Sequence, residues 1–319
     1  MKKTSVNLIA AVVLLSALAS PAHTQSTSTT PQGKFGPNES WTDNPYYGQR
    51  GTFFADVSGN GKDDAIVVNN DRVTVRRSDG YKFLPNESWT DNPYYGQRGT
   101  FFADVTGDKK ADAIVVNDDK VTVRRSNGSK FLPNESWTDN PYYGQRGIFF
   151  ADVTGDKKAD AIVVNNDKVT VRRSNGYKFG PNESWTNNPY YGQRGTYFAD
   201  VTGDGRADAI VVNDDRVTVR RSDGYKFGPN ESWTDNPYYG QRGTYFADVN
   251  GDKKADAIVV NNDKVTVRLS DGYKFGPNQS WTDNPYYGQR GTYFSDVTGD
   301  KKADAIVVND DRVTVRRSY

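Results

Sequence analysis

Short apolar runs separated by polar turns repeat along this chain every 48 residues, the spacing between Trp41 and Trp89. In one copy the runs are GTFFADV at 99–105, ADAIVV at 111–116, VTVRR at 121–125 and KFLPNESW at 130–137. Each run is rich in β-branched or aromatic residues and is bounded by turn-forming residues, so the pattern predicts four strands per copy. Asn127-Gly128 predicts a hairpin between the third and fourth strands, and Pro133 suits only a strand at a sheet edge.

The number of copies predicts the architecture. Six copies, each with one of the six tryptophans, indicate an all-β fold over residues 34–319, a six-bladed β-propeller of four-stranded antiparallel blades. The last copy stops at Tyr319, where its fourth strand would start, and a spare fourth strand at 34–41 precedes the first copy. We therefore expect the N-terminal strand to complete the last blade and close the ring. An open β-solenoid is the alternative, but it would need capping units, and both ends here are ordinary copies.

The first 33 residues differ from the repeats. Lys2 and Lys3, the apolar run at 8–18 and the small residues Ala17-Leu18-Ala19 predict a signal peptide over 1–22. Residues 23–33, rich in Ser, Thr and Gln, are expected to form a flexible leader. The apolar run is too short to span a membrane, and a short anchoring helix is the alternative to a signal peptide. From the signal sequence we expect a secreted or periplasmic protein.

Composition excludes several classes of function. The chain has 41 basic and 40 acidic residues, which gives no electrostatic basis for binding nucleic acid. It has no cysteine, and its one histidine, His23, lies in the leader, so the repeats offer neither thiol nor imidazole chemistry. Near-identical copies also place equivalent carboxylates in equivalent environments, whereas acid–base catalysis needs different ones. We therefore expect a binding protein and no enzyme.

An acidic loop follows the first strand of every copy, with the pattern D-x-[STN]-G-[DN]-x-x-x-D. Oxygen ligands at positions 1, 3, 5 and 9 of a tight loop are typical of calcium sites. The alternative is a turn in which the carboxylates accept backbone N–H groups. A lysine stands at position 6 in four loops, where calcium loops favour glycine. The candidate metal ligands are Asp56, Asn60, Asp64, Asp104, Asp108, Asp112, Asp152, Asp156, Asp160, Asp200, Asp204, Asp208, Asp248, Asp252, Asp256, Asp296, Asp300 and Asp304.

The run FADVTGDGRADAIVV at 198–212 resembles the FG-GAP or VCBS repeats of integrin α-subunit propellers and of many exported bacterial proteins. The resemblance covers 34–319, because loop, strand pattern and period agree. It implies a propeller with calcium in a structural role. Some propellers of this type are lectins that bind sugars between blades, and others are protein-binding or structural modules.

The segment TDNPYYGQR joins each blade to the next and supplies the candidate ligand site. Up-and-down connectivity places it on one face with the Asn-Asp-Asp turn, and places the acidic loop and the hairpin on the opposite face. Aromatic rings stack on pyranoses, and amide and guanidinium groups bind hydroxyls. The candidate residues are Trp41, Tyr46, Tyr47, Arg50, Trp89, Asn92, Tyr94, Tyr95, Arg98, Trp137, Tyr142, Tyr143, Arg146, Trp185, Tyr190, Tyr191, Arg194, Trp233, Tyr238, Tyr239, Arg242, Trp281, Tyr286, Tyr287 and Arg290.

The same aromatic residues could instead pack between blades as core. Our first hypothesis is an exported, multivalent, lectin-like propeller with one weak site per blade or blade junction, monomeric, with surface glycans as partners. The second is a protein-interaction or structural surface propeller with calcium-stabilised loops and no sugar site.

Overall fold

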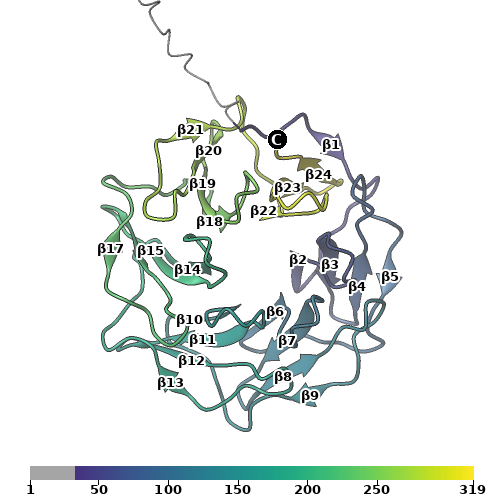
Figure 1. Cartoon of the computed structure of the whole chain (residues 1–319). Helices are drawn as coiled ribbons and strands as arrows, with labels where there is room; N and C mark the ends of the chain where they lie inside the picture. Colours follow the sequence, from purple (N-terminus) through teal and green to yellow (C-terminus); the bar gives the residue numbers. More distant parts are fainter. Residues whose placement is uncertain (1–32) are drawn as a thin grey trace, which may run out of the picture. The chain divides into compact units, whose positions relative to one another are not determined.

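The computed structural model describes residues 33–319, which form six four-stranded antiparallel sheets (Figure 1). The predicted signal peptide, and the predicted leader apart from Gly33, lie outside the described residues. Along 33–319 no helix is long and apolar enough to cross a membrane.

The strands of the six blades recur at equivalent positions. The innermost strands are β2 (Gly51–Ala55), β6 (Gly99–Ala103), β10 (Gly147–Ala151), β14 (Gly195–Ala199), β18 (Gly243–Ala247) and β22 (Gly291–Ser295). The second strands are β3 (Asp64–Val68), β7 (Asp112–Val116), β11 (Asp160–Val164), β15 (Asp208–Val212), β19 (Asp256–Val260) and β23 (Asp304–Val308). The third strands are β4 (Val73–Arg76), β8 (Val121–Arg124), β12 (Val169–Arg172), β16 (Val217–Arg220), β20 (Val265–Arg268) and β24 (Val313–Arg316). The outermost strands are β5 (Glu87–Ser88), β9 (Glu135–Ser136), β13 (Glu183–Ser184), β17 (Glu231–Ser232), β21 (Gln279–Ser280) and β1 (Glu39–Ser40).

The six sheets form a closed ring, so the predicted fold class is confirmed. Each innermost strand contacts the innermost strand of the next blade, and β22 of the last blade contacts β2 of the first. The outermost strand of the last blade is β1, which pairs antiparallel with β24 through Glu39 opposite Val315. The N-terminal strand therefore completes the last blade, as the sequence predicts.

The outermost strands are much shorter than expected. In the second blade only Glu135 and Ser136 pair with β8, and Phe131 forms an isolated bridge to Ser126. Pro133 lies between these two contacts and has no backbone N–H to donate, so the ladder is interrupted there.

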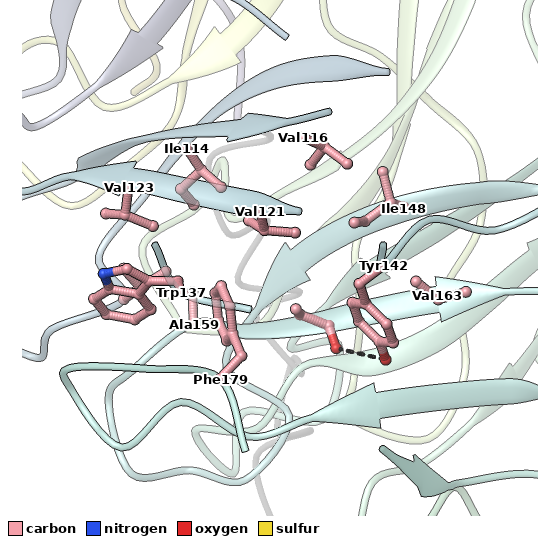
Figure 2. Close-up of a cluster of buried hydrophobic side chains, with 12 residues drawn as sticks. Ile114, Val116, Val121, Val123, Trp137, Tyr142, Ile148, Ala159, Val163 and Phe179 are labelled. Carbon is pink, nitrogen blue, oxygen red and sulfur yellow. Dashed lines mark hydrogen bonds between the residues drawn. The ribbon is translucent and has the colours of Figure 1, made fainter. Parts of the chain in front are cut away.

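The hydrophobic core lies between blades (Figure 2). The second strands are buried along their whole length because neighbouring blades cover both of their faces. Trp137 ends the outermost segment of the second blade, and Phe179 of the third blade packs edge-on against it, with ring centroids 5.1 Å apart. One blade alone could not bury these side chains, so stacking of the copies supplies the core.

The junction that closes the ring carries a polar pair that the other junctions lack. Asp63 of the first blade stands where the other blades have alanine, and Ser295 of the last blade stands where the others also have alanine. The Ser295 hydroxyl donates a hydrogen bond to the Asp63 carboxylate across this junction. Two departures from the repeat therefore meet at the seam.

Candidate functional site

The segments equivalent to 90–98 and the turns equivalent to 117–119 form one face of the ring, which we call the linker face. The backbone N–H of Gln97 donates to the Asn117 side chain over 3.2 Å, and its side-chain oxygen accepts the Asp118 N–H over 3.2 Å. Linker and turn are thus fastened together, on the same face as the connectivity predicts.

The six tryptophans belong to the core and not to the surface of the linker face. Each indole is at most 1% exposed, and its Nε1 lies 3.3–3.4 Å from a Glu or Gln oxygen two residues earlier. With both ring faces covered, none can stack on a ligand in this structure. The buried side chains are Trp41, Trp89, Trp137, Trp185, Trp233 and Trp281.

The first tyrosine of each linker is also buried. Tyr142 is 5% exposed, and its hydroxyl donates to the Ala161 carbonyl over 3.4 Å (Figure 2). Burial raises the pKa of this phenol above its usual range. The equivalent tyrosines are 5–6% exposed, so all six belong to the core and are not part of the candidate ligand surface. They are Tyr46, Tyr94, Tyr190, Tyr238 and Tyr286.

The second tyrosine and the arginine of each linker meet across the blade junctions. The guanidinium of Arg98 in the second blade lies 4.4 Å from the ring centroid of Tyr143, which leads into the third blade. The same stack occurs at all six junctions, including the closing one: Arg50–Tyr95, Arg98–Tyr143, Arg146–Tyr191, Arg194–Tyr239, Arg242–Tyr287 and Arg290–Tyr47, at 4.3–4.5 Å. These twelve side chains are the part of the predicted ligand site that the structure brings together.

The turns hold these arginines in place. Arg98 Nε donates to Asp118 over 2.5 Å, and Arg50 Nε donates to Asn70 over 2.6 Å. Asn92 is exposed on the linker and accepts the Thr90 hydroxyl with its backbone carbonyl over 2.8 Å. A cavity of about 560 Å³ lies at the closing junction, lined by Tyr47, Gln49 and Arg290 among others. The linker face therefore combines aromatic rings, guanidinium donors and a hollow at the blade junction.

The acidic loops and the hairpins equivalent to 126–130 form the opposite face, which we call the hairpin face. In the second blade, Asp104 accepts the backbone N–H groups of Gly107 over 2.6 Å and of Lys109 over 2.7 Å. Asp112 is fully buried and accepts the N–H groups of Val105 and Ser126 over 3.2 and 2.8 Å. The first and last carboxylates of the loop thus accept backbone N–H groups. This is the turn that the sequence analysis gives as the alternative to a calcium site.

Hydrogen bonds of the acidic loops also join neighbouring blades. The Asp104 carbonyl accepts the N–H of Ala159 in the third blade over 2.7 Å. The Ser126 hydroxyl in turn donates to the Val57 carbonyl of the first blade over 2.6 Å. The loops therefore contribute to ring closure whether or not they bind an ion.

The loops, as arranged, do not fit a calcium ion. Asp108 at position 5 is paired with the Lys110 ammonium over 2.8 Å, and in the loop closest to the repeat consensus Asp204 is paired with Arg206 over 2.6 Å. Across the described residues, 33–319, no three carboxylate or histidine side chains are grouped to hold a metal. Lys109, Lys157, Lys253 and Lys301 take positive φ angles of 67–70°, so lysine adopts here the turn that Gly61 and Gly205 form. Calcium binding stays a prediction of the sequence.

Burial of the last aspartate in each loop has an electrostatic consequence. Burial raises the pKa of Asp112 to about 7, and the nearby carboxylates of Asp108 and Asp104 add to the rise. The pKa of Asp208 is raised to about 7 and that of Asp256 to about 8, again mainly by burial.

Sequence reasoning missed one set of surface residues on the hairpin face. Tyr81, Tyr177, Tyr225 and Tyr273 lie at hairpin tips and are 68–73% exposed. The sequence predicts only a turn at each hairpin. The signal for these residues is an aromatic side chain within a turn, at a position that no strand alternation would bury.

The family model for FG-GAP-like repeats matches residues 104–163, 152–211 and 200–259. Residues 104–259 therefore carry FG-GAP-like repeats, and the described chain folds as a six-bladed β-propeller. Comparison with curated proteins gives no match.

Two solved structures illustrate the shared fold. One is a lectin of Agrocybe aegerita, solved for its specific recognition of non-reducing terminal N-acetylglucosamine. It is 24% identical with a TM-score of 0.60, over 80% of this chain and 73% of the lectin. The other is the Photorhabdus luminescens Tc holotoxin pore, 16% identical with a TM-score of 0.63, over 88% of this chain but only 14% of the toxin chain. At these identities the likeness concerns the fold alone.

Proposed function

We propose that this protein is an exported, multivalent glycan-binding propeller with one weak site at each blade junction of the linker face. The observation that carries the proposal is the ring of Arg–Tyr stacks, which places the same aromatic and guanidinium groups at all six junctions. A tyrosine ring supports the apolar face of a pyranose, and guanidinium N–H groups donate to its hydroxyls.

The division of labour within one site follows from the contacts. At the junction of the second and third blades, Arg98 Nε is bonded to Asp118, which fixes the plane of the guanidinium. Donation to sugar hydroxyls then falls to its Nη groups. Tyr143 is 38% exposed, so part of its ring remains open to a ligand while Arg98 covers the rest. Such a shallow, half-open site binds weakly on its own.

Repetition compensates for weak single sites. Six equivalent sites on one rigid ring gain avidity against a surface that carries many copies of one glycan, provided that the spacing allows simultaneous binding. The lectin of Agrocybe aegerita supplies a precedent for a propeller of similar fold that recognises a sugar. The signal-like N-terminal sequence supports export to where surface glycans occur. The proposal requires no catalytic step.

Calorimetric titration with a panel of mono- and oligosaccharides tests the proposal. We expect saturable binding near six equivalents per chain, one for each Arg–Tyr junction. Replacing the six linker arginines by lysine keeps the charge but removes the planar fork, and should weaken binding by about tenfold or more. The variant changes Arg50, Arg98, Arg146, Arg194, Arg242 and Arg290.

The chain offers a matched control on the same face. Arg72, Arg216 and Arg312 are exposed turn arginines that pair with the preceding aspartate, and the other copies already have lysine there. Replacing these three by lysine should leave binding unchanged. Absence of saturable binding to any glycan would contradict the proposal and favour a protein-interaction or structural propeller.

A further inference from the structure

The junction that closes the ring differs from the other five at one contact between blades. Between the first and second blades, Ala55 and Ala111 belong to the same apolar cluster. The equivalent alanines share a cluster at four further junctions. At the closing junction Ser295 and Asp63 take these two positions, and the serine hydroxyl donates to the carboxylate. The seam therefore has an ionisable contact where every other junction has an apolar one.

The backbone at this contact is the same at all six junctions. The N–H of Asp63 donates to the Asp296 carbonyl over 2.7 Å, and the N–H of Ala111 donates to the Asp56 carbonyl over 2.7 Å. The other four junctions have the equivalent bond at 2.6–2.7 Å. The side chains are thus what distinguishes the seam, and each of these N–H groups reports on its own junction.

The Asp63 carboxylate lies among other carboxylates. Asp56 and Asp64 of its own blade and Asp296 of the last blade all oppose its ionisation. Asp304 of the last blade lies opposite Ser295 in the pairing of β22 with β23. All four of these carboxylates accept backbone N–H groups of their own blades. Ionisation of Asp63 therefore adds a further negative charge to an acidic seam.

The lysines of the two acidic loops make contacts elsewhere. Lys62 lies against Gly80 and Gly299, and Lys302 lies against Gly251 of the fifth blade. Lys301 is exposed. Within residues 33–319, the Ser295 hydroxyl is the one side chain that bonds to the Asp63 carboxylate, and it is neutral. No lysine therefore compensates the charge of Asp63.

These surroundings decide which form of Asp63 the closed ring prefers. Burial raises the pKa of Asp63 from 3.8 to about 7, and the neighbouring carboxylates add to the rise, while the hydrogen bond from Ser295 opposes it. The closed seam thus binds this proton more tightly than the unfolded chain does. The stabilisation is fully present below about pH 4 and is lost as the pH rises through about 7.

We propose that the closing junction is a pH-dependent latch, which holds the ring shut in mildly acidic solution and loosens before the other five junctions above neutral pH. Buried loop aspartates such as Asp64 and Asp112 occur in every blade, so their titration does not distinguish the seam. Asp63 and Ser295 occur only there. The inference does not depend on glycan binding at the linker face.

Hydrogen–deuterium exchange of the full propeller at pH 5 and pH 8 tests the inference. Protection is corrected for the intrinsic exchange rate at each pH, and the Asp63 amide is compared with the Ala111 amide of the neighbouring junction. We expect the ratio of their protection factors to fall by about tenfold or more from pH 5 to pH 8. A ratio that stays constant would overturn the inference.

Two variants separate ionisation from a merely structural role. Asp63→Asn keeps a hydrogen-bond partner for Ser295 but cannot ionise, so its protection ratio should not change with pH. Asp63→Ala combined with Ser295→Ala gives the seam the residues of the other junctions and should also remove the pH dependence. The fold should survive because the five other copies have alanine at both positions. An Asp63→Asn protein as sensitive to pH as the native one would contradict the latch.

Moving the pair makes the test sharper. In the double-alanine protein, Ala55→Ser with Ala111→Asp places the same two side chains at the junction of the first and second blades. The loss of protection above neutral pH should then appear at position 111 and no longer at position 63. A transplanted pair that leaves protection at position 111 unchanged would overturn the inference.

Discussion

The two faces of the ring use the same contact in different ways. On the linker face an arginine stacks on the tyrosine of the next blade at every junction, and Tyr143, the most open of these rings, is 38% exposed. On the hairpin face the equivalent stack joins only some junctions, and its rings are 68–73% exposed. A contact present at every junction can serve closure and binding together. The hairpin-face stack occurs at three of the six junctions, so it cannot be needed for closure.

The largest effect is expected from Asp112, which is buried beneath the hairpin face. Asp112→Ala would leave the N–H groups of Val105 and Ser126 without an acceptor, so we expect a loss of about 3 kcal/mol in the free energy of unfolding. Chemical denaturation measures it. Asp91→Ala changes an exposed residue of the linker and should cost less than about 0.5 kcal/mol. If Asp112→Ala destabilised the protein no more than Asp91→Ala, the acidic loop would have no structural role.

The next effect is a dependence of stability on pH. Burial raises the folded-state pKa of Asp112 to about 7, above the ordinary value of 3.8. The folded protein then binds this proton more tightly than the unfolded chain, so this contribution is fully present below pH 4 and is lost as the pH rises through about 7. We expect the melting temperature at pH 5 to exceed that at pH 8 by about 5 °C.

Calcium and chelator at pH 8 provide the control for this prediction. Because Lys110 pairs with Asp108, calcium should shift the melting temperature by less than about 1 °C. A melting temperature that rises with pH would contradict the pKa argument. A large calcium-dependent rise would show instead that the ion displaces the lysine.

The smallest effect separates the two faces directly through a matched pair of substitutions. Tyr95→Ala removes the ring beneath Arg50 in a half-buried position and should cost about 1 kcal/mol. Tyr225→Ala removes a largely exposed ring and should cost less than about 0.5 kcal/mol. Denaturation curves of the two variants measure the difference, and equal losses would remove the distinction between the faces.

Much of the fold follows from the sequence because the period is unambiguous. The repeat predicts the blades, the strand order and closure by the N-terminal strand, and all three are confirmed. The outermost strands were predicted too long because one proline breaks a ladder that composition alone would extend.

The site was harder to predict because burial depends on the neighbouring blade. Tyr142 and Tyr143 are adjacent in the sequence, yet one is core and the other is 38% exposed. Because both are tyrosines in the same linker, residue type and sequence position do not show which one is buried. The exposure of the hairpin tyrosines does not follow from the strand pattern, because they lie in turns outside any strand.

Closure by β1 also determines when the ring can form. Its partner β24 lies at the far end of the repeats, so the strand synthesised first must wait for the strand synthesised last. Until then β1 is unpaired, and the third strands of the five other near-identical sheets are wrong partners for it. Asp63 and Ser295 mark the correct seam among these equivalents. Correct closure of the ring therefore depends on the order in which the strands are synthesised as well as on how tightly the blades pack.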